Sequence, residues 1–229
     1  MDLYNDDLIF KKYICYTIPD ERSERWFGEM ATLDQLKDVA LHHFATHGYD
    51  GASLANIASE VGIKKQSIYT YFKGKDNLFL QIFEDTCTQE ISIVKNDMEQ
   101  MDKKSLKSIL YTFLAQTIDR FHQRDSTKFM LRNAFLPPVH LHEEVINEMY
   151  RYLDQLQVLF LPIFQEAIEK GEIRKTINAD MATTAFIGVM DSLYVEMLYG
   201  NAQRLQKRFD ASWSIFWEGI SDVTSEEKI

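Results

Sequence analysis

Apolar side chains recur at spacings of three and four residues over most of this chain, which is the pattern of amphipathic helices. Near the N-terminal end, Leu33, Leu36, Ala40 and Phe44 share one face of a first helix. The sequence His-Gly-Tyr at 47–49 predicts the turn that closes this helix.

Residues 53–72 predict two short helices joined by a tight turn. The apolar residues of 54–61 recur at i, i+3, i+4 and i+7, and Ser53 stands where its hydroxyl can cap a free backbone N–H. Gly62 can take the positive φ that the turn requires. In the next helix, at about 64–72, Ile68 and Phe72 are expected to face inward.

The rest of that second helix carries polar and phenolic side chains that are expected to face mostly outward. They are Lys64, Lys65, Gln66, Ser67, Tyr69, Thr70 and Tyr71. Lys73 and Lys75 follow, and no carboxylate occurs between Gly62 and Lys75. Base edges and phosphates require these groups, so the pattern predicts a DNA-reading helix-turn-helix.

Downstream of this element the pattern remains helical. We expect helices at about 78–98, 104–123, 126–136 and 142–170, then one from a cap at Asn178 or Asp180 to Tyr199, then a last one that includes 209–220. Pro137 and Pro138 stop the third of these, and Pro162 is expected to bend the fourth. The fold class predicted is all-α, with nine or ten helices.

Charge is distributed unevenly. The formal net charge of this 229-residue chain is −10. Residues 62–75 nevertheless carry four positive charges and no negative one, whereas residues 79–229 sum to −7. Screening limits exposed charges to about 8–10 Å, so the local basic patch decides contact with phosphates and the acidic remainder suppresses promiscuous binding.

Residues 32–83 resemble the DNA-binding domain of the TetR family of bacterial regulators. The resemblance rests on the first-helix face, Ser53, the Val-Gly-Ile turn at 61–63, the Tyr-x-Tyr-Phe-x-x-Lys tail at 69–75, and Leu78. It implies a three-helix DNA-binding domain at 31–77 and a helical effector-binding and dimerisation domain at 78–229. One departure is Lys64, because the recognition helix of this family often opens with Ser or Thr. A side-chain cap is thereby lost, and we interpret Lys64 as a DNA contact.

The resemblance implies a homodimer that places one recognition helix of each subunit in adjacent major grooves of a palindromic operator. Lys65, Gln66 and Thr70 are expected to contact bases, with Lys64 ambiguous. Ser53, Ser67, Tyr69, Tyr71 and Lys75 are expected to hold phosphates. Tyr69 could instead be partly buried.

The last two helices suggest the dimer interface. Thr184, Gly188 and Ser192 recur every four residues, and an aromatic stripe follows at Phe209, Trp213, Phe216 and Trp217. Both faces could instead pack inside one subunit, and periodicity does not separate these alternatives.

The family resemblance also implies a small effector, apolar or amphipathic, held among the middle helices, whose binding releases DNA. Candidate lining residues are the aromatics and methionines at helical spacing: Phe113, Met130, Phe135, Tyr152, Phe164, Phe186, Met190 and Tyr194. Plain core packing is the commoner role of such residues.

Other function classes find less support. Cys15 and Cys87 give neither a disulfide framework nor zinc spacing, and no apolar stretch is judged long enough to span a bilayer, so a cytoplasmic protein is expected. No nucleotide, hydrolase or metalloprotease motif occurs, so we expect neither enzymatic activity nor a cofactor. The His140-x-His142 pair could bind a metal, but a helix start explains it more simply, and no metal site is predicted. A ligand-independent DNA-binding protein and, less favoured, an all-α enzyme with an apolar cavity remain alternatives.

Residues 1–30 form an extension of uncertain status. They mix aromatic and acidic residues without a clear helical period, and Met30 stands where chains of this family begin. Translation is hypothesised to start at Met30, and an arm that enters the minor groove is the competing interpretation.

Overall fold

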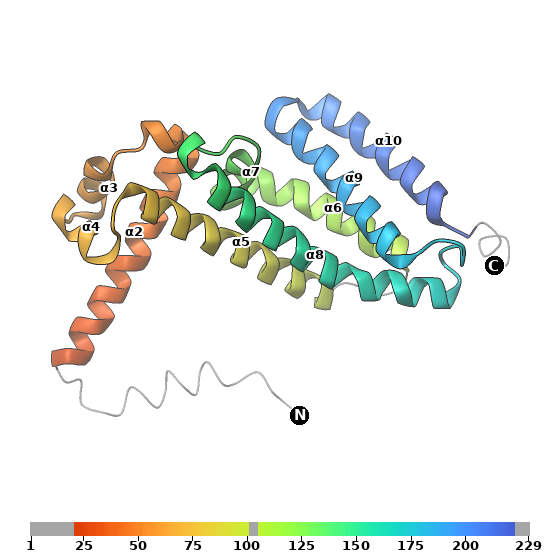
Figure 1. Ribbon diagram of the computed structural model, residues 1–229, viewed down its shortest axis with the longest axis horizontal. Helices are drawn as coiled ribbons and strands as arrows, with labels where there is room; N and C mark the ends of the chain where they lie inside the picture. The colour runs from red at the N-terminus through yellow and green to blue at the C-terminus, as the bar shows by residue number, and fades with distance from the viewer. Residues whose placement is uncertain (1–20, 101–104, 223–229) are drawn as a thin grey trace.

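The computed structural model describes residues 21–100 and 105–222, with side chains from residue 32 onward. Within these ranges the chain forms nine α-helices and one 3-10 turn, which confirms the predicted fold class (Figure 1). They are α2 (Glu21–Gly51), α3 (Leu54–Val61), α4 (Lys65–Tyr71), α5 (Lys75–Gln100), α6 (Leu106–Gln123), α7 (Asp125–Phe135), η1 (Val139–Leu141), α8 (His142–Lys170), α9 (Ala179–Tyr199) and α10 (Ala202–Ile220).

Helices α2, α3 and α4 form a small head at one end of the molecule (Figure 1). Its core is built by Leu36, Phe44, Ile57 and Ile68, none of which has exposed surface. The chain turns sharply at Gly48 and Gly62, where φ is 71° and 78°, values that favour glycine. Packing of short amphipathic helices around these turns is what holds α4 at the surface.

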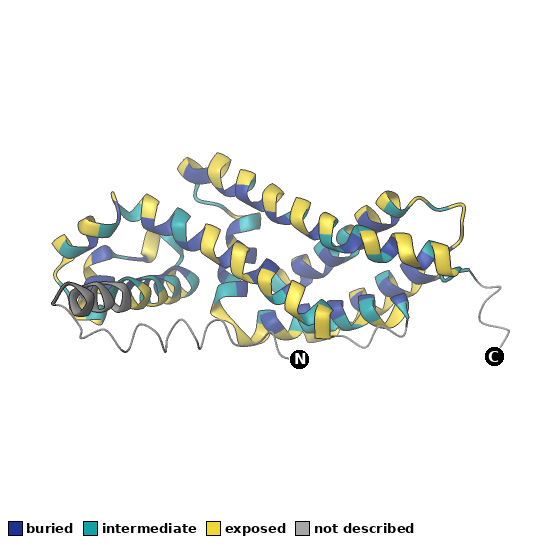
Figure 2. Cartoon of the chain, turned by 90° about the horizontal axis from the view of Figure 1, so that it is seen from below, coloured by how far each residue is buried: buried dark blue, intermediate teal, exposed yellow. Residues whose placement is uncertain are grey.

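Helix α5 leaves the head and runs into a larger helical body, in which α9 packs between α8 and α10 (Figure 1). Buried positions face inward along every helix and exposed ones face outward (Figure 2). The predicted terminations also hold, since α8 ends at Gly171 with φ 77° and Asn178 caps α9. The helix boundaries agree with the expected ones to within a few residues.

The N-terminal segment differs from expectation. Helix α2 begins at Glu21, so residues 21–29 are helical and continuous with the first helix of the head. The sequence shows no clear helical period there. Residues 1–20, on which the rest of that expectation falls, lie outside the described part of the chain.

Helix α9 is unusually apolar. By length and composition it could cross a membrane, although only 39% of its most apolar window is buried within the subunit. In this structure it packs against α8 and α10, as a core helix of a bundle does. Its remaining apolar surface is available to a partner.

Candidate functional site

The outer face of α4 presents the predicted polar side chains. Lys64, Lys65, Gln66 and Thr70 are exposed, and Tyr69 retains 53% of its surface. Ile68 and Phe72 are buried beneath them, as the period predicted. The polar face is therefore held rigidly by the packed face of the same helix.

Four of the five expected phosphate-contacting residues are half-buried: Ser53, Ser67, Tyr71 and Lys75. Tyr71 also packs against the core. The Ser53 hydroxyl accepts a hydrogen bond from the Ala55 N–H at 3.2 Å and so caps α3. Lys64 makes no side-chain cap at the start of α4, as predicted.

Lys75, at the start of α5, lies against Tyr49 of the head. Its Nζ is 4.3 Å from the centroid of the Tyr49 ring, which is a cation–π contact. The Tyr49 hydroxyl donates to Asp76, and His140 Nε2 lies 3.3 Å from the same hydroxyl. From the sequence, Tyr49 is expected only in the turn that closes the first helix, because nothing in the pattern links it to a histidine 91 positions away.

Electrostatics around Tyr49 and Asp76 follow from this geometry. Burial raises the pKa of Tyr49, and the neighbouring Asp76 carboxylate raises it further. The hydrogen bond from Tyr49 in turn lowers the pKa of Asp76, and His140 adds to this effect. Asp76 is therefore ionised at neutral pH and remains an acceptor.

An aromatic cluster joins the head to the body. Phe129 of α7 lies 6.2 Å from Phe44 of α2 and 5.3 Å from Phe79 of α5, measured between ring centroids. On the surface beside it, His42 Nδ1 of α2 contacts Asp125 Oδ2 of α7 at 3.1 Å. Head and body thus meet through specific side chains as well as through the α5 backbone.

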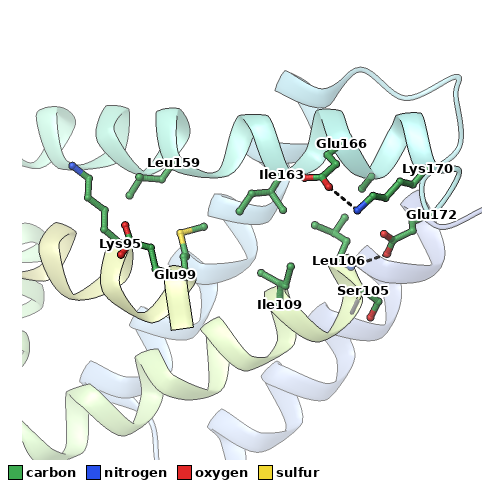
Figure 3. Close-up of a pocket in the computed structure, with 12 residues that line it drawn as sticks. Lys95, Glu99, Ser105, Leu106, Ile109, Leu159, Ile163, Glu166, Lys170 and Glu172 are labelled. Atoms are coloured by element: carbon green, nitrogen blue, oxygen red, sulfur yellow. Dashed lines mark hydrogen bonds and ion pairs between the residues drawn. The ribbon is translucent and has the colours of Figure 1, made fainter. Parts of the chain in front are cut away.

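A groove lies at the other end of the body, where α5, α6 and α8 meet. Its volume is about 320 Å³, and charged side chains occupy both of its ends while aliphatic ones lie between them (Figure 3). It is lined by Lys95, Met98, Glu99, Ser105, Leu106, Ile109, Leu159, Ile163, Glu166, Ala167, Lys170 and Glu172.

Several of the charges at one end of the groove are already paired. Lys170 Nζ contacts Glu166 Oε1 at 2.6 Å, and Glu172 Oε2 accepts a hydrogen bond from the Leu106 N–H at 2.7 Å. Neither Lys95 nor Glu99, at the opposite end, has an ion pair among the described residues. The arrangement suits a ligand with an apolar chain and a polar or charged head.

None of the eight predicted effector-lining residues contributes to this groove. Seven of them are core residues with at most 3% exposure: Phe113, Met130, Tyr152, Phe164, Phe186, Met190 and Tyr194. The eighth, Phe135, is 40% exposed at the end of α7. The rings pack on one another, as Phe113 does on Phe160 at 4.8 Å, and the groove is lined by aliphatic and charged residues instead.

A buried polar network crosses the body. Arg120 of α6 donates to Asp97 at 3.0 Å and to the Thr117 hydroxyl at 2.8 Å, and its Nε lies 3.4 Å from Glu90 of α5. Thr127 of α7 donates to Glu90 at 2.7 Å. This network is not predicted by the periodicity of the sequence, since each member falls on an otherwise amphipathic helix.

The expected interface residues separate into two groups. Phe209, Trp213, Phe216 and Trp217 are at most 9% exposed within one subunit, and Phe216 contacts Phe186 at 5.8 Å. The aromatic stripe is thus core, which corrects its assignment to the interface. Thr184 and Gly188 are exposed and Ser192 is half-buried on α9.

The His140-x-His142 pair assembles no metal site. No group of three or more potential ligands occurs among the described residues. His140 instead contacts Tyr49 and Asp76.

Comparison with known proteins agrees with the geometry of the head. Residues 36–82 match the model of the bacterial regulatory proteins of the tetR family. This part of the chain is a TetR-family DNA-binding domain. Regulators of this family bind DNA, dimerise and bind small-molecule effectors, and they are typically not enzymes.

Relatives of this chain include the fatty acid metabolism regulator protein of Bacillus subtilis, 24% identical over 69% of this chain and 78% of that protein. The negative transcriptional regulator IcaR of the biofilm operon in Staphylococcus epidermidis is 27% identical over 55% of this chain and 71% of its own length.

Solved structures share the fold. The transcriptional regulator FadR of Bacillus subtilis, in complex with stearoyl-CoA, matches with a TM-score of 0.62 and 20% identity over 82% of this chain and 99% of that chain. A TetR regulator from Chloroflexus aurantiacus matches with a TM-score of 0.69 and 18% identity over 84% and 97%. These structures show the fold, and the match of residues 36–82 together with the curated relatives identifies a DNA-binding transcriptional regulator.

Proposed function

We propose that this TetR-family regulator is a homodimeric cytoplasmic repressor that reads a palindromic operator with α4 and is released by an amphipathic effector. The observation that carries the proposal is the exposed face of α4. There Lys64, Lys65, Gln66 and Thr70 stand free on a helix with no carboxylate. In this proposal Lys65, Gln66 and Thr70 contact bases, and Lys64 contacts either a base or a phosphate.

Phosphate contact falls mainly to Lys75 and Tyr69. Tyr69 lies on α4 and is 53% exposed, and Lys75 follows at the start of α5. Ser53, Ser67 and Tyr71 remain candidates for phosphate contact, although the Ser53 hydroxyl also caps α3 and Tyr71 also packs against the core.

Dimerisation is proposed through α9 and α10. Met181, Val195 and Tyr199 on α9 and Ile215 on α10 are between 40% and 72% exposed, although they are large and apolar. Gly188 lies among them, and a Cβ added there would meet nothing within 4 Å. A glycine inside a helix costs about 0.5–1 kcal/mol relative to alanine, and no packing within the subunit requires it. Close approach of a second copy of the chain accounts for this glycine. The exposed Thr184, one turn earlier on α9, has a small side chain that also allows such an approach.

The effector is proposed to bind in the groove between α5, α6 and α8. Its volume of about 320 Å³ lies at the lower end of ligand pockets, so it suits one aliphatic chain with a charged head at the rim. The stearoyl-CoA bound by the Bacillus subtilis FadR structure supports a long-chain acyl compound as the first class to test. A ligand-independent DNA-binding protein is the alternative.

Selection of bound sequences from random duplexes by the full chain tests the proposal. One enriched palindrome with half-site centres about ten base pairs apart is expected for a dimer of such heads. Enrichment of a non-palindromic site would contradict the dimer, and no enrichment would contradict sequence-specific reading. Loss of the protein–DNA complex on adding stearoyl-CoA would support a long-chain acyl effector. A complex that persists with acyl-CoA of every chain length would favour the ligand-independent DNA-binding protein.

A further inference from the structure

Lys75, a proposed phosphate contact, is held by a side chain that itself touches the body. The Tyr49 ring lies beneath the Lys75 ammonium and packs edge-on against Phe79, with centroids 5.3 Å apart. One edge of Tyr49 faces His140, whose ring centroid is 5.0 Å away. The position of the Lys75 ammonium therefore depends on the Tyr49 ring, and that ring has a neighbour outside the head.

His140 belongs to the body and not to the head. It lies in η1, the short turn that follows Pro137 and Pro138 and leads directly into α8. Its Nε2 is 3.3 Å from the Tyr49 hydroxyl and 3.6 Å from Asp76 Oδ1. His140 is half-exposed, so its contacts with the head, and not burial in the core, fix its ring.

Helix α8 connects this contact to the groove. It begins at His142 and carries Leu159, Ile163 and Lys170 of the groove wall. A ligand that displaces α8 displaces η1 with it, because only Leu141 lies between His140 and the helix start. The hydrogen bond from His140 to Tyr49 is then the first polar contact with the head to lengthen.

We propose that His140 is a positioning residue that couples the effector domain to DNA binding by fixing Tyr49 and, through it, Lys75. This inference rests on the proposed contact of Lys75 with a backbone phosphate. His140 touches no DNA itself, and its effect on affinity passes through Lys75.

The test is a double-mutant cycle on the affinity for the selected duplex. His140→Ala is expected to weaken binding by about two- to fivefold, the range of an exposed cation–π contact. In the Lys75→Ala background the same substitution is expected to have no further effect, because the residue it positions is gone. Tyr49→Phe keeps the ring under Lys75 and removes only the hydroxyl, so it is expected to match His140→Ala and not to add to it.

His142→Ala is the matched control, since His142 is exposed and has no hydrogen bond or ion pair among the described residues. It is expected to bind as the unaltered chain does. The salt dependence of binding provides a second measurement. Lys75→Ala is expected to lower the slope of log affinity against log salt by about one unit per subunit, and His140→Ala, which only displaces Lys75, is expected to lower it by less.

The outcomes separate this inference from the proposed function. If Lys75→Ala weakens binding while His140→Ala has no effect, or if the two losses add, the coupling is refuted and phosphate contact stands. If Lys75→Ala changes neither affinity nor salt slope, the phosphate contact and the coupling both fail. Loss of folding in His140→Ala would show as a lowered melting temperature, and Tyr49→Phe then decides the question alone.

Discussion

The side chains of Arg120 and Glu90 lie 3.4 Å apart, from Arg120 Nε to Glu90 Oε2, in the interior of the body. Arg120 is 8% exposed and Glu90 is 2% exposed, so both charges are largely removed from water. Arg120 also donates a hydrogen bond to Asp97, which lies on α5 as Glu90 does. Glu90 also accepts a hydrogen bond from Thr127 of α7. The pair fixes the relative position of α5, α6 and α7.

Arg120→Met is expected to lower the free energy of unfolding by about 3–5 kcal/mol, because it leaves the Glu90 carboxylate buried without its cation. Adding Glu90→Gln should restore part of the loss. Urea denaturation monitored by circular dichroism measures both. Arg124→Met, at an exposed arginine one turn further on, is the control and should change stability by less than about 0.5 kcal/mol. Equal losses at the two arginines would contradict a structural role for the network.

Gln66→Ala is expected to relax base preference at one position of each half-site, since an amide reads an adenine edge in the major groove. Lys75→Ala should instead weaken binding about equally across sequences and lower the salt slope by about one unit per subunit. Selection with each variant distinguishes the two patterns. Uniform loss from both would refute this division of roles.

Val195→Glu is expected to convert the dimer to a monomer and to abolish operator binding, because it places a charge on the exposed apolar face of α9. Val139→Glu is the matched control, at a valine that is 93% exposed in η1. Sedimentation equilibrium reports the mass directly. A dimer that survives Val195→Glu would place the interface elsewhere.

Filling the groove should block the effector without changing the head. Ile163→Trp adds bulk to its aliphatic wall and is expected to weaken binding of stearoyl-CoA by at least about tenfold while operator affinity is kept. Val158→Trp, at an exposed position of the same helix, should bind as before. Calorimetric titration with stearoyl-CoA provides the readout. Unchanged binding in Ile163→Trp would move the acyl site away from this groove.

The contact between His42 and Asp125 predicts a pH dependence of stability. The hydrogen bond from His42 lowers the pKa of Asp125, with a smaller contribution from Lys128. A lowered folded-state pKa means that this stabilisation is present above the ordinary carboxyl pKa of about 4 and is lost as the pH falls through the folded value. Both partners are about half-exposed, so the effect is expected to be less than about 1 kcal/mol.

Asp125→Asn should therefore destabilise the protein slightly at neutral pH, and the loss should vanish as the pH falls through the folded-state pKa of Asp125. Urea denaturation at neutral pH and at an acidic pH at which Asp125 is protonated, with Asp154→Asn at an exposed acid of α8 as the control, measures this difference. A loss that persists at the lower pH would point to a cause other than charge.

Periodicity was sufficient for the helices and for the inward and outward faces of α4, because local pattern and burial agree there. It was insufficient for the aromatic stripe of α10. An apolar face must be buried, but whether Trp213 packs on its own subunit or on another depends on helix arrangement, which the spacing does not encode.

The groove and the Tyr49–His140 contact escaped the sequence for the same reason. The groove forms where three helices diverge, and its aliphatic lining, such as Ile109 and Leu159, resembles ordinary helix packing. Tyr49 and His140 are brought together only by docking of the body on the head.

Helix α8 also has a mechanical consequence. Its 29 residues run from His142 to Lys170 with Pro162 inside the helix, and they span about 43 Å at 1.5 Å per residue. If it pivots near its midpoint, a tilt of about 3° moves either end by about 1 Å. The His140–Tyr49 contact of 3.3 Å is already near the limit of a hydrogen bond, so that displacement breaks it. A ligand bound near the Lys170 end of α8 thus needs to move the helix only slightly to weaken the contacts that position Lys75.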